Sequence, residues 1–112
     1  MHESSICRSL LQHVETLAHE QNAASIKRIT VRLGPLSGIT PWQLEGAYNH
    51  TRPGTAAEHA ELIIEHAPIR VKCRQCDAES EVTLDNLNCA HCGNHQTTLL
   101  SGDEFILVGI TV

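Results

Sequence analysis

The chain has 112 residues, which suffices for one small domain or for two very small ones that share a core. Its net charge of −5 disfavours binding to a phosphate backbone. Aromatic residues make up only 3%, so the hydrophobic core has few bulky side chains, and a bound metal or another cross-link would help to stabilise it. The longest apolar stretch, FILVGI, is too short to span a membrane, and the N-terminus lacks the pattern of a signal peptide. We therefore expect a cytoplasmic protein whose cysteines bind metal or react rather than form disulfides.

The first predicted element is an amphipathic helix over residues 4–22. Apolar residues recur there at the helical spacing i, i+3, i+4, i+7, at Cys7, Leu10, Leu11, Val14, Leu17 and Ala18. Ser4 or Ser5 is expected to cap its start, and Asn22 to lie near its end. Glu3 would then precede the helix, at the positive end of its dipole.

Two strands and a second helix are predicted beyond it, and a third strand near the C-terminus. The segment SIKRITVRLG alternates apolar and polar residues, which predicts a strand that ends at Gly34. In TPWQLEGAYNHT, Thr40 is the predicted N-cap, with Pro41 at the first helical position and Gln43 closing a capping box, and the helix is expected to end near Asn49. AELIIEHA predicts the second strand. EFILVGITV predicts the third, whose one face carries Ile106, Val108, Ile110 and Val112.

Residues 73–102 differ in composition from both flanks. They hold four of the five cysteines, little apolar material and several turn residues. Good strands before and after this segment suggest an insertion, with the last strand returning to the sheet of the first domain. We predict an α+β fold, with a small mixed or antiparallel three-stranded sheet, two helices and an inserted zinc-ribbon module. The predicted domains are residues 1–70 with 103–112, and residues 71–102.

The cysteines of this segment form two C-x2-C pairs, CRQC at 73–76 and CAHC at 89–92. Two such turns, brought together by a hairpin, make a tetrahedral four-sulfur site for zinc. The predicted ligands are Cys73, Cys76, Cys89 and Cys92. With all four positions taken by sulfur, no position is open for water, so the metal would stabilise the fold rather than catalyse. An iron–sulfur cluster and redox chemistry are the alternatives, although a thioredoxin-like site needs only one such pair.

The ribbon allows other functions besides this structural role. His91 and His95 lie in or beside the second pair, either as solvated loop residues or as a substitute ligand or charge switch near neutral pH. A zinc-ribbon module that binds protein or nucleic acid is the alternative function. Nucleic acid is disfavoured, because residues 70–102 carry three positive and four negative side chains and no aromatic one. A metalloenzyme is disfavoured too, since no acid–base pair is visible and a terminus is a poor place to preorganise a transition state.

The N-terminal sequence Met1-His2-Glu3 offers a second kind of metal site. The terminal amine, the His2 amide and the His2 imidazole are three consecutive nitrogen donors, which suit nickel(II) or copper(II) in a planar arrangement. Glu3 could add an oxygen ligand or orient His2. Cys7, the fifth cysteine, lies on the apolar side of the predicted helix, so it is either a small buried hydrophobe or a soft accessory ligand.

Taken together, these motifs resemble the HypA/HybF family of hydrogenase-maturation nickel metallochaperones. The resemblance covers essentially the whole chain, through MHESSICRSLL, RLGPLSGI, LEGAYNHTRPGT, the two C-x2-C pairs and GDEFILVGITV. It implies a nickel site at His2 with Glu3 adjacent, a structural zinc at the four paired cysteines, and no catalytic activity. It also implies that the protein hands nickel, as cargo, to the [NiFe]-hydrogenase large subunit together with a nickel-handling GTPase. A monomer and a homodimer both remain open, as does a role in urease maturation.

Two residues depart from the family pattern. Some relatives carry an acidic residue where Thr40 stands, close to the nickel site, so a side-chain oxygen ligand from that loop is doubtful here. Tyr48 stands where relatives usually have Phe, and we expect this exchange to alter packing only slightly.

Overall fold

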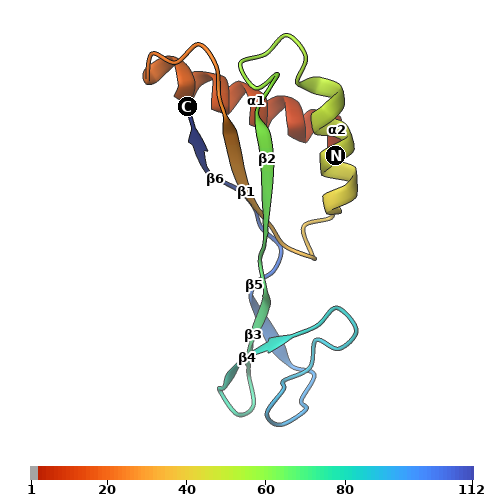
Figure 1. The fold of residues 1–112 in the computed structure, drawn as a ribbon. Coiled ribbons are helices and arrows are strands. Elements are labelled where there is room, and N and C mark those ends of the chain that lie inside the picture. The colour runs from red at the N-terminus through yellow and green to blue at the C-terminus, as the bar shows by residue number, and fades with distance from the viewer. Residues whose placement is uncertain (1–2) are drawn as a thin grey trace. The chain divides into compact units, whose positions relative to one another are not determined.

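The computed structural model describes residues 3–112, with side chains from Ser4 onward. Figure 1 shows the helices and strands of this described part: α1 (Glu3–Glu20), β1 (Arg28–Leu33), α2 (Pro41–Thr51), β2 (Glu61–His66), β3 (Ile69–Cys73), β4 (Glu79–Val82), β5 (Thr97–Ser101) and β6 (Phe105–Thr111). They form two compact units. The helical unit comprises the residues up to Arg32 together with Ile39–Glu65 and Ile106–Val112, and the cysteine unit comprises Leu33–Gly38 and His66–Phe105.

Helix α1 buries the apolar stripe that its sequence pattern predicted, with Cys7, Leu10, Leu11, Val14 and Ala18 in the core. The chain leaves the helix through Asn22, whose φ of 56° lets the Ala23 N–H donate to the Ala18 carbonyl at 2.8 Å. The predicted start was wrong. Ser4 and Ser5 lie inside the helix rather than at its cap, because α1 already begins at Glu3. The apolar pattern did not mark this first turn, whose backbone N–H groups have no partner within the helix.

Helix α2 begins with the predicted capping box. Thr40 Oγ1 accepts a hydrogen bond from the Gln43 N–H at 3.1 Å, and the Gln43 side chain accepts one from the Thr40 N–H at 3.0 Å. The helix ends at Thr51, later than the predicted end at Asn49. Arg52 keeps helical backbone angles, and its N–H still donates to the Tyr48 carbonyl. Pro53 then ends the ladder, because a proline has no backbone N–H to donate.

The helical unit contains a three-stranded sheet in the order β2-β1-β6. Strand β1 runs parallel to β2 and antiparallel to β6, so the sheet is mixed. The bonds that show these directions are Glu61 N–H to Lys27 O (3.0 Å), Ala67 N–H to Leu33 O (3.0 Å), Lys27 N–H to Thr111 O (2.7 Å) and Gly34 N–H to Glu104 O (2.8 Å). Helix α2 provides the crossover between the two parallel strands.

The two faces of β1 differ in character. One face is buried and carries Ile29, Val31 and Leu33. From the other face, Arg28 pairs with Glu61 and Arg32 pairs with Glu65, each at 3.3 Å. Opposite charges on neighbouring strands favour this register, although each exposed pair adds little stability.

The predicted stripe on β6 is largely exposed. Ile106, Val108 and Val112 keep 48%, 49% and 41% of their surface accessible, while Phe105 and Leu107 alternate with the first two and are half-buried. The strand lies at the edge of its sheet, where fewer neighbours cover it. The predicted strand is therefore confirmed, and its stripe is a half-exposed surface rather than core.

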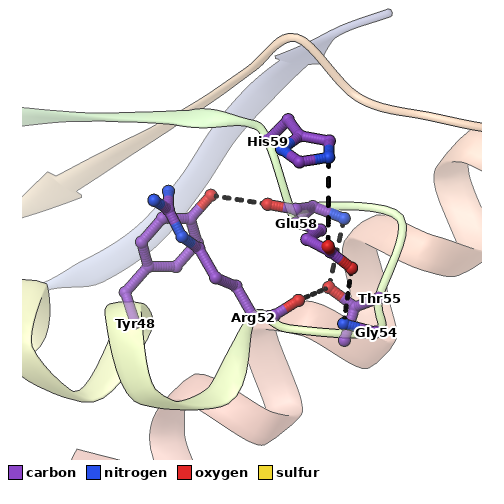
Figure 2. A network of polar contacts seen from close by, with 7 residues as sticks. Tyr48, Arg52, Gly54, Thr55, Glu58 and His59 are labelled. Carbon is purple, nitrogen blue, oxygen red and sulfur yellow. Dashed lines mark hydrogen bonds and ion pairs between the residues drawn. The ribbon is translucent and has the colours of Figure 1, made fainter.

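Tyr48 and Arg52 fix the loop between α2 and β2 (Figure 2). The Tyr48 hydroxyl donates to the Ala60 carbonyl at 2.8 Å, and Arg52 donates to the same carbonyl at 2.9 Å. The guanidinium also lies over the Tyr48 ring, 5.2 Å from its centroid. Within the loop, the Glu58 carboxylate accepts the Gly54 N–H at 2.8 Å. Tyr48 thus uses the hydroxyl that a phenylalanine would lack.

The cysteine unit has its own three-stranded sheet, in the order β4-β3-β5, with β3 antiparallel to both neighbours. The segment that follows β1 belongs to this unit, since the Leu36 N–H donates to the Gly102 carbonyl at 2.7 Å. A Cβ on Gly34 would collide with that carbonyl, so only glycine permits this approach. The predicted α+β fold, with two helices, a mixed three-stranded sheet and a zinc-ribbon module, is confirmed.

Candidate metal centre

The four paired cysteines converge at one point of the cysteine unit. Cys73 ends β3, Cys76 lies in the turn that follows it, and Cys89 and Cys92 come from the turn before β5. The Sγ atoms of Cys73 and Cys92 are 3.6 Å apart, as are those of Cys76 and Cys89. All four Sγ atoms lie within 4.8 Å of one another.

These distances fit a tetrahedral zinc ion. Four bonds of about 2.3 Å in tetrahedral geometry place the sulfurs about 3.8 Å apart, close to the observed 3.6 Å. Two of the four cysteines are buried and two are exposed, so the cluster lies at the surface of the cysteine unit. The donor set and its geometry therefore suit a closed, structural metal site.

Each C-x2-C pair folds as the same backbone turn. In the first turn, the Sγ of Cys73 accepts hydrogen bonds from the N–H groups of Gln75 at 3.3 Å and Cys76 at 3.4 Å. In the second, the Sγ of Cys89 accepts the equivalent bonds from His91 at 3.3 Å and Cys92 at 3.4 Å. The residue after each pair has a positive φ, 65° at Asp77 and 78° at Gly93. Hydrogen bonds to sulfur stabilise a thiolate, so the turns prepare the first cysteine of each pair for a metal.

The same hydrogen bonds distribute charge unequally over the four thiols. The N–H groups of Cys92 and His91 lower the pKa of Cys89 to about 6, and those of Cys76 and Gln75 also lower the pKa of Cys73. For Cys76, a backbone hydrogen bond from Ala78 is outweighed by desolvation and the neighbouring thiols, which raise its pKa to about 12. Four adjacent thiols resist ionising together, and a bound dication removes that obstacle by neutralising them.

A buried serine attaches the second turn to the sheet. Ser80, on β4, is only 6% exposed, and its Oγ accepts a hydrogen bond from the Ala90 N–H at 3.2 Å. Thr97, at the start of β5, donates to the Leu87 carbonyl at 3.1 Å, just before this turn. Sequence patterns did not reveal either residue, because a single Ser or Thr in a short strand carries no motif. The alternation of Ser80 with the exposed Glu79 and Glu81 was the one available signal.

Strand β3 carries two of the basic residues that a nucleic-acid-binding surface would use. Arg70 and Lys72 stand directly opposite Glu81 and Glu79 on β4. Lys72 also pairs with Asp77 at 3.4 Å. Acidic side chains thus accompany the basic ones, and this arrangement does not make a continuous positive surface for phosphates.

The remaining candidate ligands are placed as follows. His91 and His95 are both exposed, and neither belongs to the cysteine cluster found among the described residues. Cys7 is fully buried on α1, with its Sγ 3.8 Å from the Leu44 carbonyl of α2, as expected for a small core residue. Thr40 uses its hydroxyl in the α2 capping box. His2, the predicted nickel ligand, lies outside the described residues, and the structure gives no side-chain position for Glu3.

Comparisons with known proteins agree on one family over the whole chain. A family model described as "Hydrogenase/urease nickel incorporation, metallochaperone, hypA" matches residues 1–112. The chain is 44% identical over 107 residues to hydrogenase maturation factor HypA of Aquifex aeolicus, covering 96% of this chain and 93% of the relative. It is 39% identical over 110 residues to the factor of the same name from Nitrosospira multiformis, covering 98% and 96%.

Solved structures give the same result. The solution structure of the Ni metallochaperone HypA from Helicobacter pylori superposes with a TM-score of 0.70 at 25% identity, covering 99% of this chain and 97% of that one. A second solution structure, of a HypA protein, superposes with a TM-score of 0.74, also at 25% identity and covering 99% and 95%. Neither helix in the described residues is long and apolar enough to cross a membrane.

Proposed function

Since the chain belongs to the HypA family of hydrogenase/urease nickel-incorporation metallochaperones, we propose that it binds Ni(II) at its N-terminus and delivers it for [NiFe]-hydrogenase maturation. The observation that carries this proposal is the family match across all 112 residues, which includes Met1-His2-Glu3 as well as the paired cysteines. Nickel is the cargo of this function. The family is one of metallochaperones rather than enzymes, and we assign no catalytic residue.

The proposed nickel site uses the terminal amine, the His2 amide and the His2 imidazole. Nitrogen donors in a plane suit Ni(II), whereas tetrahedral thiolates suit zinc, so the two sites of one chain select different metals. Glu3 is the first residue of α1 and directly follows His2. Thr40 is engaged in a helix cap, which supports a site built from the terminus without a ligand from that loop.

The second proposed site is a structural zinc held by Cys73, Cys76, Cys89 and Cys92. Sulfur distances of 3.6 Å and the two matching turns support zinc, and the absence of an open ligand position argues against chemistry at this metal. Accordingly, we propose that residues 71–102 are the zinc-binding domain and that residues 1–70 with 103–112 are the nickel-binding domain. The paired charges on β3 support this role over the alternative of a nucleic-acid-binding ribbon.

The proposed partners follow from the same function. A nickel carrier must receive and release its metal by contact with other proteins, for which the family implies a nickel-handling GTPase and the [NiFe]-hydrogenase large subunit. Ligands on a chain terminus rearrange more readily than ligands on a rigid scaffold, and this suits transfer. We propose that the protein acts in the cytoplasm, as a monomer or a homodimer, without nucleic acid or membrane partners.

Nickel titrations on two N-terminal variants test the proposal. His2→Ala should abolish tight nickel binding, because it removes the imidazole from the chelate. One residue added before Met1 should also weaken binding, because it converts the terminal amine into an amide and displaces the three nitrogens. Zinc content and helix content, measured on the same samples, should be unchanged in both. Tight nickel binding by His2→Ala would remove the site from the terminus, while full affinity in the extended form would exclude the amine as a ligand.

A further inference from the structure

We propose that the nickel-loaded N-terminus docks into a hollow between the first turn of α1 and helix α2, where the indole of Trp42 flanks the metal. This inference rests on the proposed nickel site at His2 and adds the surface that holds the loaded terminus. Its occupant is the segment Met1–His2, which precedes the described residues. The hollow lies wholly within the helical unit.

The hollow has a volume of about 810 Å³ and is open to solvent. Ser4 and Ser5 line it from α1, and Trp42, Glu45, Gly46 and His50 are among the residues that line it from α2. A Cβ built on Gly46 meets no atom within 4 Å, so the space beside this glycine is empty. A larger side chain at this position would leave the core untouched and fill the hollow.

The N-terminal segment is attached at the rim of this space. Ser4 lines the hollow, and only Glu3 separates it from His2. The two residues ahead of α1, when extended, span at most about 7 Å. Residues 1–2 can therefore reach the hollow without any rearrangement of α1, because Ser4 and Ser5 of its first turn line that space.

The lining suits a metal chelate with a net positive charge. Trp42 is 82% exposed, more than any other large apolar side chain in the described part of the chain. An indole face attracts cations, and covering it also removes apolar surface from water. The side chains of Glu45 and His50 make no hydrogen bond or ion pair with other described residues. Their carboxylate and imidazole thus remain available to a nickel(II) chelate, which keeps one positive charge after losing one amide proton.

Fluorescence tests whether the metal reaches Trp42, which is the single tryptophan of the chain. Ni(II) quenches indole emission only at short range. Titrating the full-length, zinc-containing protein with Ni(II) should quench emission in step with nickel binding, measured in parallel by competition with a metal indicator. His2→Ala should show no quenching over the same concentrations, and His13→Gln, which changes an exposed histidine of α1 outside the hollow, should behave as wild type.

Filling the hollow tests docking directly. Gly46→Leu should weaken nickel binding at least about tenfold, since even changes outside the ligand set typically cost a metal site 10–100-fold. It should also reduce quenching of Trp42. Gly46→Ala is the matched control, because it adds one methyl group and favours the helix, so it should raise the melting temperature and leave nickel affinity unchanged.

The outcomes separate this inference from the proposed function. Nickel binding without quenching of Trp42, or full nickel affinity in Gly46→Leu, would overturn docking and leave the nickel site at His2 intact. If wild type binds no nickel, both proposals fail. Quenching that survives His2→Ala would show that nickel reaches the indole without the terminus, and would also overturn docking.

Discussion

Ser80 is the one polar side chain that the described core buries, and it lies beside the second cysteine turn. A buried hydroxyl is tolerated when it is hydrogen-bonded, and this one accepts the Ala90 N–H at 3.2 Å. Because Ala90 separates Cys89 from His91, the bond fixes the turn whose N–H groups point at the Cys89 sulfur. Ser80 thus holds metal ligands in place from outside the ligand set.

Replacing Ser80 by Ala should weaken zinc binding about 10–100-fold, the usual cost of losing such a support. The measurement is competition with a chelator of known zinc affinity. Ser101→Ala is the control within the same unit, because the Ser101 hydroxyl donates to the Pro68 carbonyl, away from the cysteines. Equal zinc affinity in the two variants would show that the Ser80 bond does not position the ligands.

Tyr48 and Arg52 share one acceptor, the carbonyl of the buried residue Ala60. Burial raises the pKa of Tyr48, so its phenol stays protonated and keeps donating at neutral pH. Tyr48→Phe alone should cost about 0.5–1.5 kcal/mol of unfolding free energy, because Arg52 still serves the carbonyl. Tyr48→Phe combined with Arg52→Gln should cost more than the sum of the single changes, since an unpaired buried carbonyl costs about 1–3 kcal/mol. Urea unfolding of the four proteins measures this coupling, and strict additivity would contradict it.

Among the elements, those of the helical unit were predictable and those of the cysteine unit largely were not. Helices α1 and α2 and strands β1 and β6 each carry a clear apolar period or a capping box, and β2 is a short apolar run. Strand β4 reads ESEV and β5 reads TTLLS, and neither shows a strong alternation of apolar residues. The approach of Gly34 to Gly102 depends on residues far apart in sequence. The cysteine cluster was predictable because ligand spacing is local, whereas its support by Ser80 comes from the tertiary fold.

Removal of zinc should unfold the cysteine unit and leave the helices folded. The cysteine unit has few buried apolar residues, so metal binding supplies much of its folding free energy. Without zinc, residues 67–104 become a loop between β2 and β6. The entropy cost of closing a loop grows slowly with length, about 0.6 kcal/mol for each doubling, so β6 can still pair with β1.

Chelation of the wild type and a Cys92→Ser variant both test this expectation. Limited proteolysis should cut within residues 73–102, while circular dichroism should retain the helical signal. A cysteine unit that stayed protease-resistant after zinc removal would contradict the expectation that zinc stabilises its fold.

For the whole molecule, the two proposed metals have opposite requirements. The proposed zinc ligands are distributed over two turns joined by a sheet, so we expect release of that metal to unfold the cysteine unit. The proposed nickel ligands occupy one end of the chain, ahead of α1, so nickel can leave without disturbing the core. Under this proposal, one chain retains zinc while it exchanges nickel with its partners.

A deletion strain tests the proposed delivery of nickel in the cell. Loss of the protein should lower [NiFe]-hydrogenase activity in nickel-poor medium, because the apo-enzyme then depends on the small pool of free nickel. Excess nickel should restore part of the activity, since mass action replaces delivery.

Complementation of the deletion strain tests the two proposed metal sites separately. The His2→Ala variant should fail to restore activity in nickel-poor medium and should respond to added nickel as the deletion does. The Cys92→Ser variant should lose activity if contact with partners requires the folded cysteine unit. Hydrogenase activity and large-subunit processing are the measurements. Normal processing in the deletion strain without added nickel would contradict a role in delivery, because the enzyme would then acquire its metal unaided.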